Sequence, residues 1–152
     1  RTLSADEAAA RQAAGAPFAL RLDVAKARAL CGDLRFTDER AGEIAAEPER
    51  SGDIVLARRE TPCSYHLCVT LDDHLQGVTL VTRAEDLLPA THIHRLLQAL
   101  LGLHMPHYAH HKILTDSDGT RLAKRQGAAS LRDLRAAGMA PPEIRRMVGF
   151  SG

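Results

Sequence analysis

The residues best suited to chemistry lie in the stretch Asp118–Arg125, which reads Asp-Gly-Thr-Arg-Leu-Ala-Lys-Arg. It places three cations, Arg121, Lys124 and Arg125, within five residues and shortly after Gly119, which favours a turn. Such a loop can clamp a triphosphate, because a lysine ammonium stabilises the charge that develops as pyrophosphate leaves. Taken alone, the same run is more often a solvated surface loop between a strand and a helix.

The strands that must position this loop are predicted from short apolar or alternating runs. These runs are Phe18–Asp23, Leu34–Thr37, Asp53–Arg58, Tyr65–Leu71 and Val78–Arg83, with a further strand end at His110–Leu114. The run Tyr65–Leu71 is interpreted as a strand because its apolar residues alternate, and Asp72-Asp73 is expected to break it. Residues 40–52 are charged and contain Pro48 and Gly52, which predicts a surface connection.

Helices complete the predicted pattern. Ser4 and Glu7 form a capping box at the start of an Ala-rich helix that ends near Gly15. Apolar residues with helical spacing follow Pro89 and precede Gly102: Ile93, Leu96, Leu97, Leu100 and Leu101. Shorter helices are expected after Ser130 and from Pro141 or Pro142. This order indicates an α/β fold, in which ligands bind beyond the carboxyl ends of the strands, where the basic loop falls.

The bulk composition is that of a globular domain, or of parts of two. The 152 residues are 45% hydrophobic and 26% charged, with a net charge of +1 that neither requires nor excludes a polyanionic partner. No apolar run approaches the ~20 residues that span a bilayer, so no membrane partner is expected. Cys31, Cys63 and Cys68 are odd in number and lack a zinc-ligand spacing, which favours a reducing, cytoplasmic location with no disulfide and no metal. The chain opens on Arg1 rather than Met, and residue 1 is interpreted as an internal position of a longer protein.

Several blocks in a fixed order resemble the glutamate-type class I aminoacyl-tRNA synthetases. The blocks are Gly52–Arg59, Ser64–Asp73, Gly77–Asp86, the Leu-rich helix and Arg121–Arg125. Members of that family carry a tyrosine before a strand that ends in Asp-Asp, then a strand that ends in Arg-Gly-Glu-Asp, then a KMSKS-type loop, often written Lys-Leu-Ser-Lys-Arg. The resemblance is close over residues 50–150 and looser over residues 1–50.

The resemblance implies the second half of a Rossmann-type catalytic core together with part of the acceptor-stem-binding insertion. Residues 1–50 would belong to the insertion, residues 51–127 would complete the nucleotide-binding core, and residues 128–152 would form a short helical tail. Within the family the chain looks most like the truncated paralogues of glutamyl-tRNA synthetase, which glutamylate the queuosine base of tRNA(Asp). The segments Asp86–Thr91 and His94–Gln98 and the stop at Gly152 carry that closer likeness.

The resemblance also implies roles for particular residues. Tyr65 would hydrogen-bond the amino-group side of the bound glutamate. Arg83 would pair with a glutamate carboxylate through the bidentate geometry that lysine cannot offer. Lys124 would act catalytically on the ATP phosphates, within an ATP-binding loop that comprises Arg121, Leu122, Ala123, Lys124 and Arg125. Considered singly, Tyr65 would more often be a half-buried sheet tyrosine, and Arg83 a surface arginine.

Some positions depart from the family pattern. Ala84 replaces a glycine, Arg121 replaces the first lysine of the loop, and Ala123 replaces a serine. The HIGH motif is absent: His92-Ile93-His94 lies in the Leu-rich helix, where its neighbours predict a buried stripe instead. The further histidines His104, His110 and His111 are expected to be structural or solvent-facing, because adjacent histidines on a strand point to opposite faces.

The implied reaction is the ATP-dependent activation of glutamate to glutamyl-adenylate, followed by transfer to the queuosine base of tRNA(Asp). The partners expected for the complete, monomeric enzyme are glutamate, ATP with Mg²⁺, and tRNA; any zinc would come from residues outside this chain. Residues 1–152 alone are expected to be inactive, because half of the ATP site is missing. Two alternatives remain open at this point: a glutamyl-tRNA synthetase that charges tRNA(Glu), and a non-catalytic RNA-binding or interaction fragment.

Overall fold

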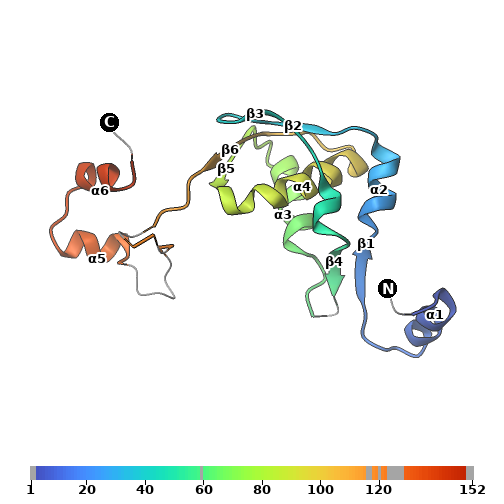
Figure 1. Cartoon of the computed structure of the whole chain (residues 1–152). Coiled ribbons are helices and arrows are strands. Elements are labelled where there is room, and N and C mark those ends of the chain that lie inside the picture. The colour runs from blue at the N-terminus through green and yellow to red at the C-terminus, as the bar shows by residue number, and fades with distance from the viewer. Residues whose placement is uncertain (1–2, 59, 116–117, 120, 123–128, 150–152) are drawn as a thin grey trace. The chain divides into compact units, whose positions relative to one another are not determined.

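The computed structural model describes residues 3–58, 60–115, 118–119, 121–122 and 129–149. It divides into two compact units, Arg1–His111 and Lys112–Gly152. Their elements are labelled in Figure 1. Among the described residues, no helix is both long enough and apolar enough to cross a membrane.

A four-stranded sheet forms the framework of the first unit. Its strands, in spatial order, are β3 (Gly42–Ala45), β2 (Arg35–Asp38), β6 (His107–His111) and β5 (Leu80–Ala84). β5 and β2 both run parallel to β6, whereas β2 and β3 form an antiparallel hairpin. In the β5–β6 register Arg83 lies opposite His110, and Asp38 at the end of β2 lies opposite Tyr108. Parallel pairing therefore brings Asp38, Arg83 and His110 to the same end of the sheet, where these three strands finish.

A separate antiparallel pair joins β1 (Ala19–Leu22) to β4 (Ile54–Arg58), with a shift of register between Leu20 and Arg21. The strands predicted near residues 18–23, 34–37, 53–58 and 78–83 are confirmed within one or two residues at each end. The last predicted strand, at 110–114, is found earlier in the chain, as β6.

The helices begin and end at local signals in the sequence. Ser4 caps α1 (Ala5–Ala13), with Glu7 completing the capping box, and Asp23 caps α2 (Val24–Cys31). α4 (Leu88–Leu101) ends at Gly102, which adopts the left-handed conformation (φ 63°) that glycine tolerates. The second unit holds α5 (Leu131–Ala136), with its capping box from Ser130, and α6 (Pro141–Met147).

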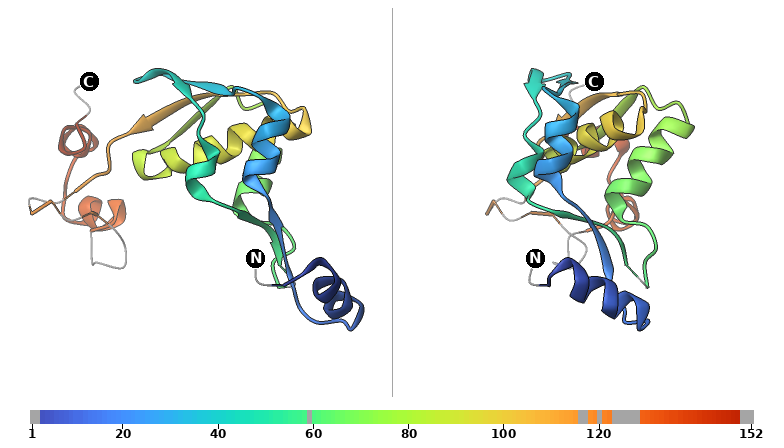
Figure 2. Two further views of the ribbon diagram at one scale, coloured as in Figure 1. Left: turned by 45° about the vertical axis from the view of Figure 1, so that its right-hand side comes forward. Right: turned by 90° about the vertical axis from the view of Figure 1, so that its right-hand side faces the viewer.

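The core of the first unit lies between α4 and the sheet. Ile93, Leu96 and Leu97 of α4 are buried in one cluster with Phe36 of β2 and Tyr108 of β6. α2 and α3 (Tyr65–Leu75) pack against α4 (Figure 2). The predicted apolar stripe of the Leu-rich helix is thereby confirmed for Ile93, Leu96 and Leu97, with Leu100 partly buried, whereas Leu101 is exposed. The buried stripe fixes the face of α4 from which other side chains reach the sheet.

The segment Tyr65–Leu71 is not a strand, so that prediction is wrong. It forms the first part of α3, which runs through Asp72 and Asp73 to Leu75 and is followed by Gly77 (φ 66°). The Ser64 hydroxyl accepts a hydrogen bond from the Leu67 N–H (3.3 Å) and starts the helix. A short apolar run with alternate spacing also fits a helix that is partly buried, and packing on α4 decides between the two.

Two further predictions are wrong. Residues 40–52 are more than a surface connection, because they contain β3 and the 3₁₀ helix η1 (Pro48–Ser51), and the side chains of Ala46 and Pro48 are buried. The cysteines are not all unpaired: Cys63 and Cys68 form a disulfide, while Cys31 is free. Because residues 65–68 are helical, Cys68 turns back toward Cys63, and their Cα atoms lie 6.2 Å apart.

Candidate active site

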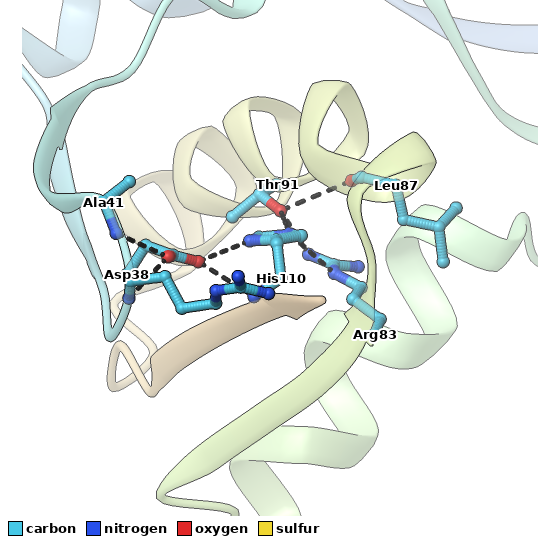
Figure 3. A network of polar contacts seen from close by, with 7 residues as sticks. Asp38, Ala41, Arg83, Leu87, Thr91 and His110 are labelled. Carbon is cyan, nitrogen blue, oxygen red and sulfur yellow. Dashed lines mark hydrogen bonds and ion pairs between the residues drawn. The ribbon is translucent and has the colours of Figure 1, made fainter. Parts of the chain in front are cut away.

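Arg83 is a buried cation whose guanidinium is held on three sides. Its side chain is only 8% exposed. Nε donates to His110 Nε2 (3.4 Å), Nη1 lies 3.2 Å from His94 Nδ1, and Nη2 donates to the Thr91 hydroxyl (2.5 Å). The guanidinium also lies over the ring of Tyr108, 5.2 Å from its centroid. Figure 3 shows Arg83, Thr91 and His110 converging from β5, α4 and β6.

Asp38 anchors the far end of this network. One carboxylate oxygen accepts from the backbone N–H groups of Arg40 (2.9 Å) and Ala41 (3.0 Å); Figure 3 shows the contact with Ala41. The other accepts from the backbone N–H of His110 (3.0 Å) and lies 2.6 Å from His110 Nδ1. Burial alone would raise the pKa of Asp38, but these hydrogen bonds outweigh it and lower the pKa to about 2. Asp38 is therefore a carboxylate at neutral pH.

Two histidines continue the network from Arg83 toward the surface. His94 Nδ1 accepts from Arg83, so His94 Nε2 carries the proton and donates to His66 Nδ1 (3.1 Å). Burial, and then the charge of Arg83, lower the pKa of His94 to about 3. The same two causes lower the pKa of His66. Both rings are therefore neutral at pH 7, and neither adds positive charge beside Arg83.

Tyr65 begins α3 next to these two rings. Its ring centroid lies 5.7 Å from that of His66 and 5.8 Å from that of His94, and its side chain is 54% exposed. Since Arg83 also contacts His94, the structure brings Tyr65 and Arg83 to the same side of the sheet, where both are neighbours of the His94 ring. The phenol is the exposed member of the pair and the guanidinium the buried one.

The remaining predicted site residues belong to the second unit or lie outside the described residues. Ala123, Lys124 and Arg125 are not among the described residues. Arg121 pairs with Thr115 in an isolated antiparallel bridge, and the Leu122 N–H donates to the Leu114 carbonyl (2.9 Å). The role of the basic loop on ATP therefore stays a prediction.

The arrangement around Arg83 is suited to holding an anion. Of its five N–H bonds, residues that the structure describes engage three, which leaves one on each terminal nitrogen without a partner among them. No carboxylate forms an ion pair with Arg83 within the described part of the chain. Burial raises the pKa of Asp73, and the charge of Arg83 partly offsets that rise. A buried, unpaired guanidinium is costly, and a bound carboxylate would offset that cost in bidentate geometry.

Four residues of this network, Asp38, Thr91, His94 and His110, had no functional role in the sequence prediction. His94 and His110 were expected to be structural, and both are buried (2% and 7% exposed). Their contact with Arg83 carries no signal in the sequence, because the partners are 11 and 27 residues away. His104, also expected to be structural or exposed, pairs with His74 (Nδ1 to Nδ1, 2.8 Å). Among the described residues, no group of three or more His, Cys, Asp or Glu could hold a metal ion.

The lowered pKa of His94 predicts a loss of stability in acid. Between pH 6.5 and about 3, the unfolded chain protonates this imidazole while the folded protein does not, so the free energy of unfolding falls as the pH falls. We expect His94→Gln, which keeps an acceptor and a donor but does not titrate, to reduce the loss between pH 7 and 4.5 by about 2 kcal/mol. Urea unfolding at both pH values measures it.

The matched control for that experiment is Leu101→Gln, which introduces the same amide at an exposed, non-titrating position of the same helix and leaves His94 in place. It should keep the wild-type dependence on pH. Equal pH dependence in the wild type and in His94→Gln would show that His94 is not the group held neutral by the fold.

Comparison with known proteins identifies the family. Residues 1–152 match the model described as tRNA synthetases class I (E and Q), catalytic domain. The chain is 58% identical over 99 residues to a glutamyl-Q tRNA(Asp) synthetase of Rhodobacter capsulatus, an alignment that covers 65% of this chain and 36% of that protein. It is 41% identical to the glutamyl-Q tRNA(Asp) synthetase of Nocardia farcinica, covering 95% of this chain and 44% of the relative.

Glutamate–tRNA ligases are also similar. An enzyme of Thermus thermophilus is 34% identical, covering 99% of this chain and 32% of the ligase. In a crystal structure of the glutamate–tRNA synthetase of Elizabethkingia anophelis, the matching region has a TM-score of 0.64 at 26% identity and covers 83% of this chain and 25% of that one. The chain thus spans less than half the length of these relatives. Its fold is that of part of a class I core, and the chain belongs to the family of class I tRNA synthetases for glutamate and glutamine.

Proposed function

We propose that this chain is part of an enzyme that activates glutamate with MgATP and transfers it to the queuosine base of tRNA(Asp). The observation that carries the proposal is Arg83, a buried guanidinium held by three neighbours, with one N–H on each terminal nitrogen that no described residue engages. A carboxylate is the anion that matches this pair of donors. The closer relatives by identity over most of the chain, at 41% and 39%, are named for glutamyl-Q tRNA(Asp).

In the proposed complex, a carboxylate of glutamate pairs with Arg83, and the phenol of Tyr65 hydrogen-bonds the amino-group side. Burial strengthens the first interaction, because the guanidinium is already removed from water before the substrate arrives. Tyr65 is half-exposed beside His66 and His94, which supports its contact with a ligand bound next to Arg83.

The proposed chemistry has two steps. An oxygen of the glutamate α-carboxylate attacks the α-phosphorus of ATP, the bond to the bridging oxygen breaks, and pyrophosphate leaves. The glutamyl group of the resulting adenylate is then transferred to the RNA, and AMP is released. The cations of the basic loop, with Lys124 foremost, would stabilise the charge on the leaving pyrophosphate. Such chemistry depends on positioning and on charge stabilisation.

A second candidate is the charging of tRNA(Glu), which the similarity to glutamate–tRNA ligases supports at 34% identity. Both enzymes would use the same glutamate site, so the structure around Arg83 suits either one. A purely non-catalytic RNA-binding role is less well supported, because it gives no reason for Tyr65 and Arg83 to meet at one imidazole.

The test uses the complete protein that contains this chain. We expect glutamate-dependent exchange of pyrophosphate into ATP, and transfer of labelled glutamate to tRNA(Asp) that contains queuosine. The same tRNA without queuosine is the matched control and should accept no label. Labelling of tRNA(Glu) instead would support the second candidate, and the absence of glutamate-dependent exchange would refute both.

A further inference from the structure

The side chains behind Arg83 form a hydrogen-bonded chain, at whose centre the Thr91 hydroxyl lies within hydrogen-bonding distance of both His110 Nε2 (3.0 Å) and the Leu87 carbonyl oxygen (3.4 Å). The chain runs from Asp38 through His110 and Thr91 to the guanidinium (Figure 3). All four side chains are at most 8% exposed. We propose that Asp38, His110 and Thr91 are positioning residues, which fix one tautomer of His110 and thereby hold Arg83 with its two remaining N–H bonds available to the glutamate carboxylate. This inference rests on the proposed function.

The carboxylate sets the tautomer. An ionised carboxylate can only accept hydrogen bonds, and Asp38 lies 2.6 Å from His110 Nδ1. A proton must therefore lie on Nδ1, since otherwise two lone pairs would face each other at that distance. Four hydrogen bonds reach the carboxylate: those from the backbone of Arg40, Ala41 and His110, and that from Nδ1. They keep Asp38 in its ionised, accepting form.

The tautomer in turn fixes the acceptor that Arg83 meets. His110 Nε2 accepts from Arg83 Nε (3.4 Å), so it presents a lone pair there, and it lies 3.0 Å from the Thr91 hydroxyl, whose single proton can go to Nε2 or to the Leu87 carbonyl. The hydroxyl oxygen of Thr91 then accepts from Arg83 Nη2. The opposite tautomer would direct an N–H at the N–H of Arg83, and the contact between Nε and Nε2 would be lost.

The consequence is a guanidinium whose plane is set before substrate binds. A free arginine side chain has many rotamers, and a bidentate contact requires only one of them. Here Nε and Nη2 are tied to β6 and α4, so that freedom is already lost in the folded protein. Asp38 also supplies a negative charge on the far side of the His110 ring, which compensates the buried cation without occupying its terminal nitrogens. Preorganisation of this kind raises affinity for the ground state and the transition state alike.

The main test is Thr91→Val in the complete enzyme, assayed by glutamate-dependent pyrophosphate exchange. Valine keeps the shape and the branching at Cβ but removes the acceptor for Nη2 and the hydroxyl contact with His110. We expect the KM for glutamate to rise about tenfold, because one hydrogen bond to the charged guanidinium is lost. We expect kcat to change less than about twofold, because that bond positions Arg83 equally in the substrate complex and in the transition state. Thr91→Ser, which restores the hydroxyl, should return KM to within about twofold of wild type.

The matched control is Thr79→Val, which makes the same substitution at an exposed position before β5. It should leave KM and kcat unchanged. A thermal melt of each variant separates a positioning effect from unfolding, since a destabilised but correctly positioned site would keep its KM at a temperature where the protein is folded.

A second measurement reads the tautomer directly. Two-bond ¹H–¹⁵N NMR of histidine-labelled enzyme should show His110 protonated at Nδ1, and Asp38→Asn should shift it toward Nε2 protonation. An Nε2-protonated His110 in the wild type, or a Thr91→Val variant with wild-type KM, overturns the inference while leaving the proposed function intact. If the wild type shows no glutamate-dependent exchange, the proposed function fails. The NMR measurement then still shows whether Asp38 fixes the tautomer of His110.

Discussion

Replacing Arg83 with lysine in the complete enzyme is expected to lower kcat/KM for glutamate activation by about 100- to 1,000-fold. Truncating one partner of a buried, hydrogen-bonded charge pair costs about 2–5 kcal/mol. Lysine keeps the charge but has one nitrogen, so it cannot reach His110, Thr91 and His94 together and also offer two parallel donors to a carboxylate. Pyrophosphate exchange at varied glutamate concentration measures the effect.

The affinity for a non-hydrolysable glutamyl-adenylate analogue, measured by isothermal titration calorimetry, should be lower in Arg83→Lys than in the wild type. It should be lower still in Arg83→Ala. Arg35→Lys is the matched control, because Arg35 is an exposed arginine paired with Glu43 on the surface of the same sheet. Exposed ion pairs contribute about 0–1 kcal/mol, so this variant should behave as wild type. Unchanged affinity in Arg83→Ala would mean that glutamate is not held by this guanidinium.

Replacing Lys124 with alanine should lower kcat for adenylate formation by about 100-fold and leave the KM for glutamate nearly unchanged. The reason is that a loop ammonium acts on the charge that appears only as pyrophosphate leaves, and loss of one such group costs about 2.7–4 kcal/mol in the transition state. Single-turnover measurement of adenylate formation separates this step from product release.

Lys26→Ala, at an exposed position of α2, is the control for loss of a surface lysine and should keep the wild-type rate. The prediction for Lys124 rests on its place in the sequence Arg121-Leu122-Ala123-Lys124-Arg125. A kcat within about threefold of wild type would show that another cation of the loop, or none, carries this role.

The local elements followed from the sequence where a single side chain decides the structure. The capping boxes at Ser4 and Ser130 start α1 and α5, and Gly102 ends α4, because each satisfies backbone groups within the same turn. Most of the apolar stripe of α4, from Ile93 to Leu100, was predicted correctly for a similarly local reason, since apolar residues at 3.6-residue spacing indicate one buried face; Leu101, at the end of the helix, is exposed.

The helix α3 shows where local pattern fails. Tyr65, Leu67, Val69 and Leu71 alternate as in a strand, yet the segment is helical and packs on α4. A run of seven residues is too short for the two periods to be told apart. The assignment also matters for function, because the helix places Tyr65 at its first turn, beside His94, rather than on the face of a sheet.

The sequence by itself determined the α/β class, most helix and strand positions, and the ordered blocks from which binding roles are predicted for Tyr65 and Arg83. Only the tertiary structure decided that Asp38, Thr91, His94 and His110 surround Arg83. The hydrogen bonds involved join residues up to 72 positions apart, and they depend on the register of β6 against β2 and β5. Register is set by packing across the whole sheet, so no local pattern in the sequence encodes which buried donor meets which acceptor.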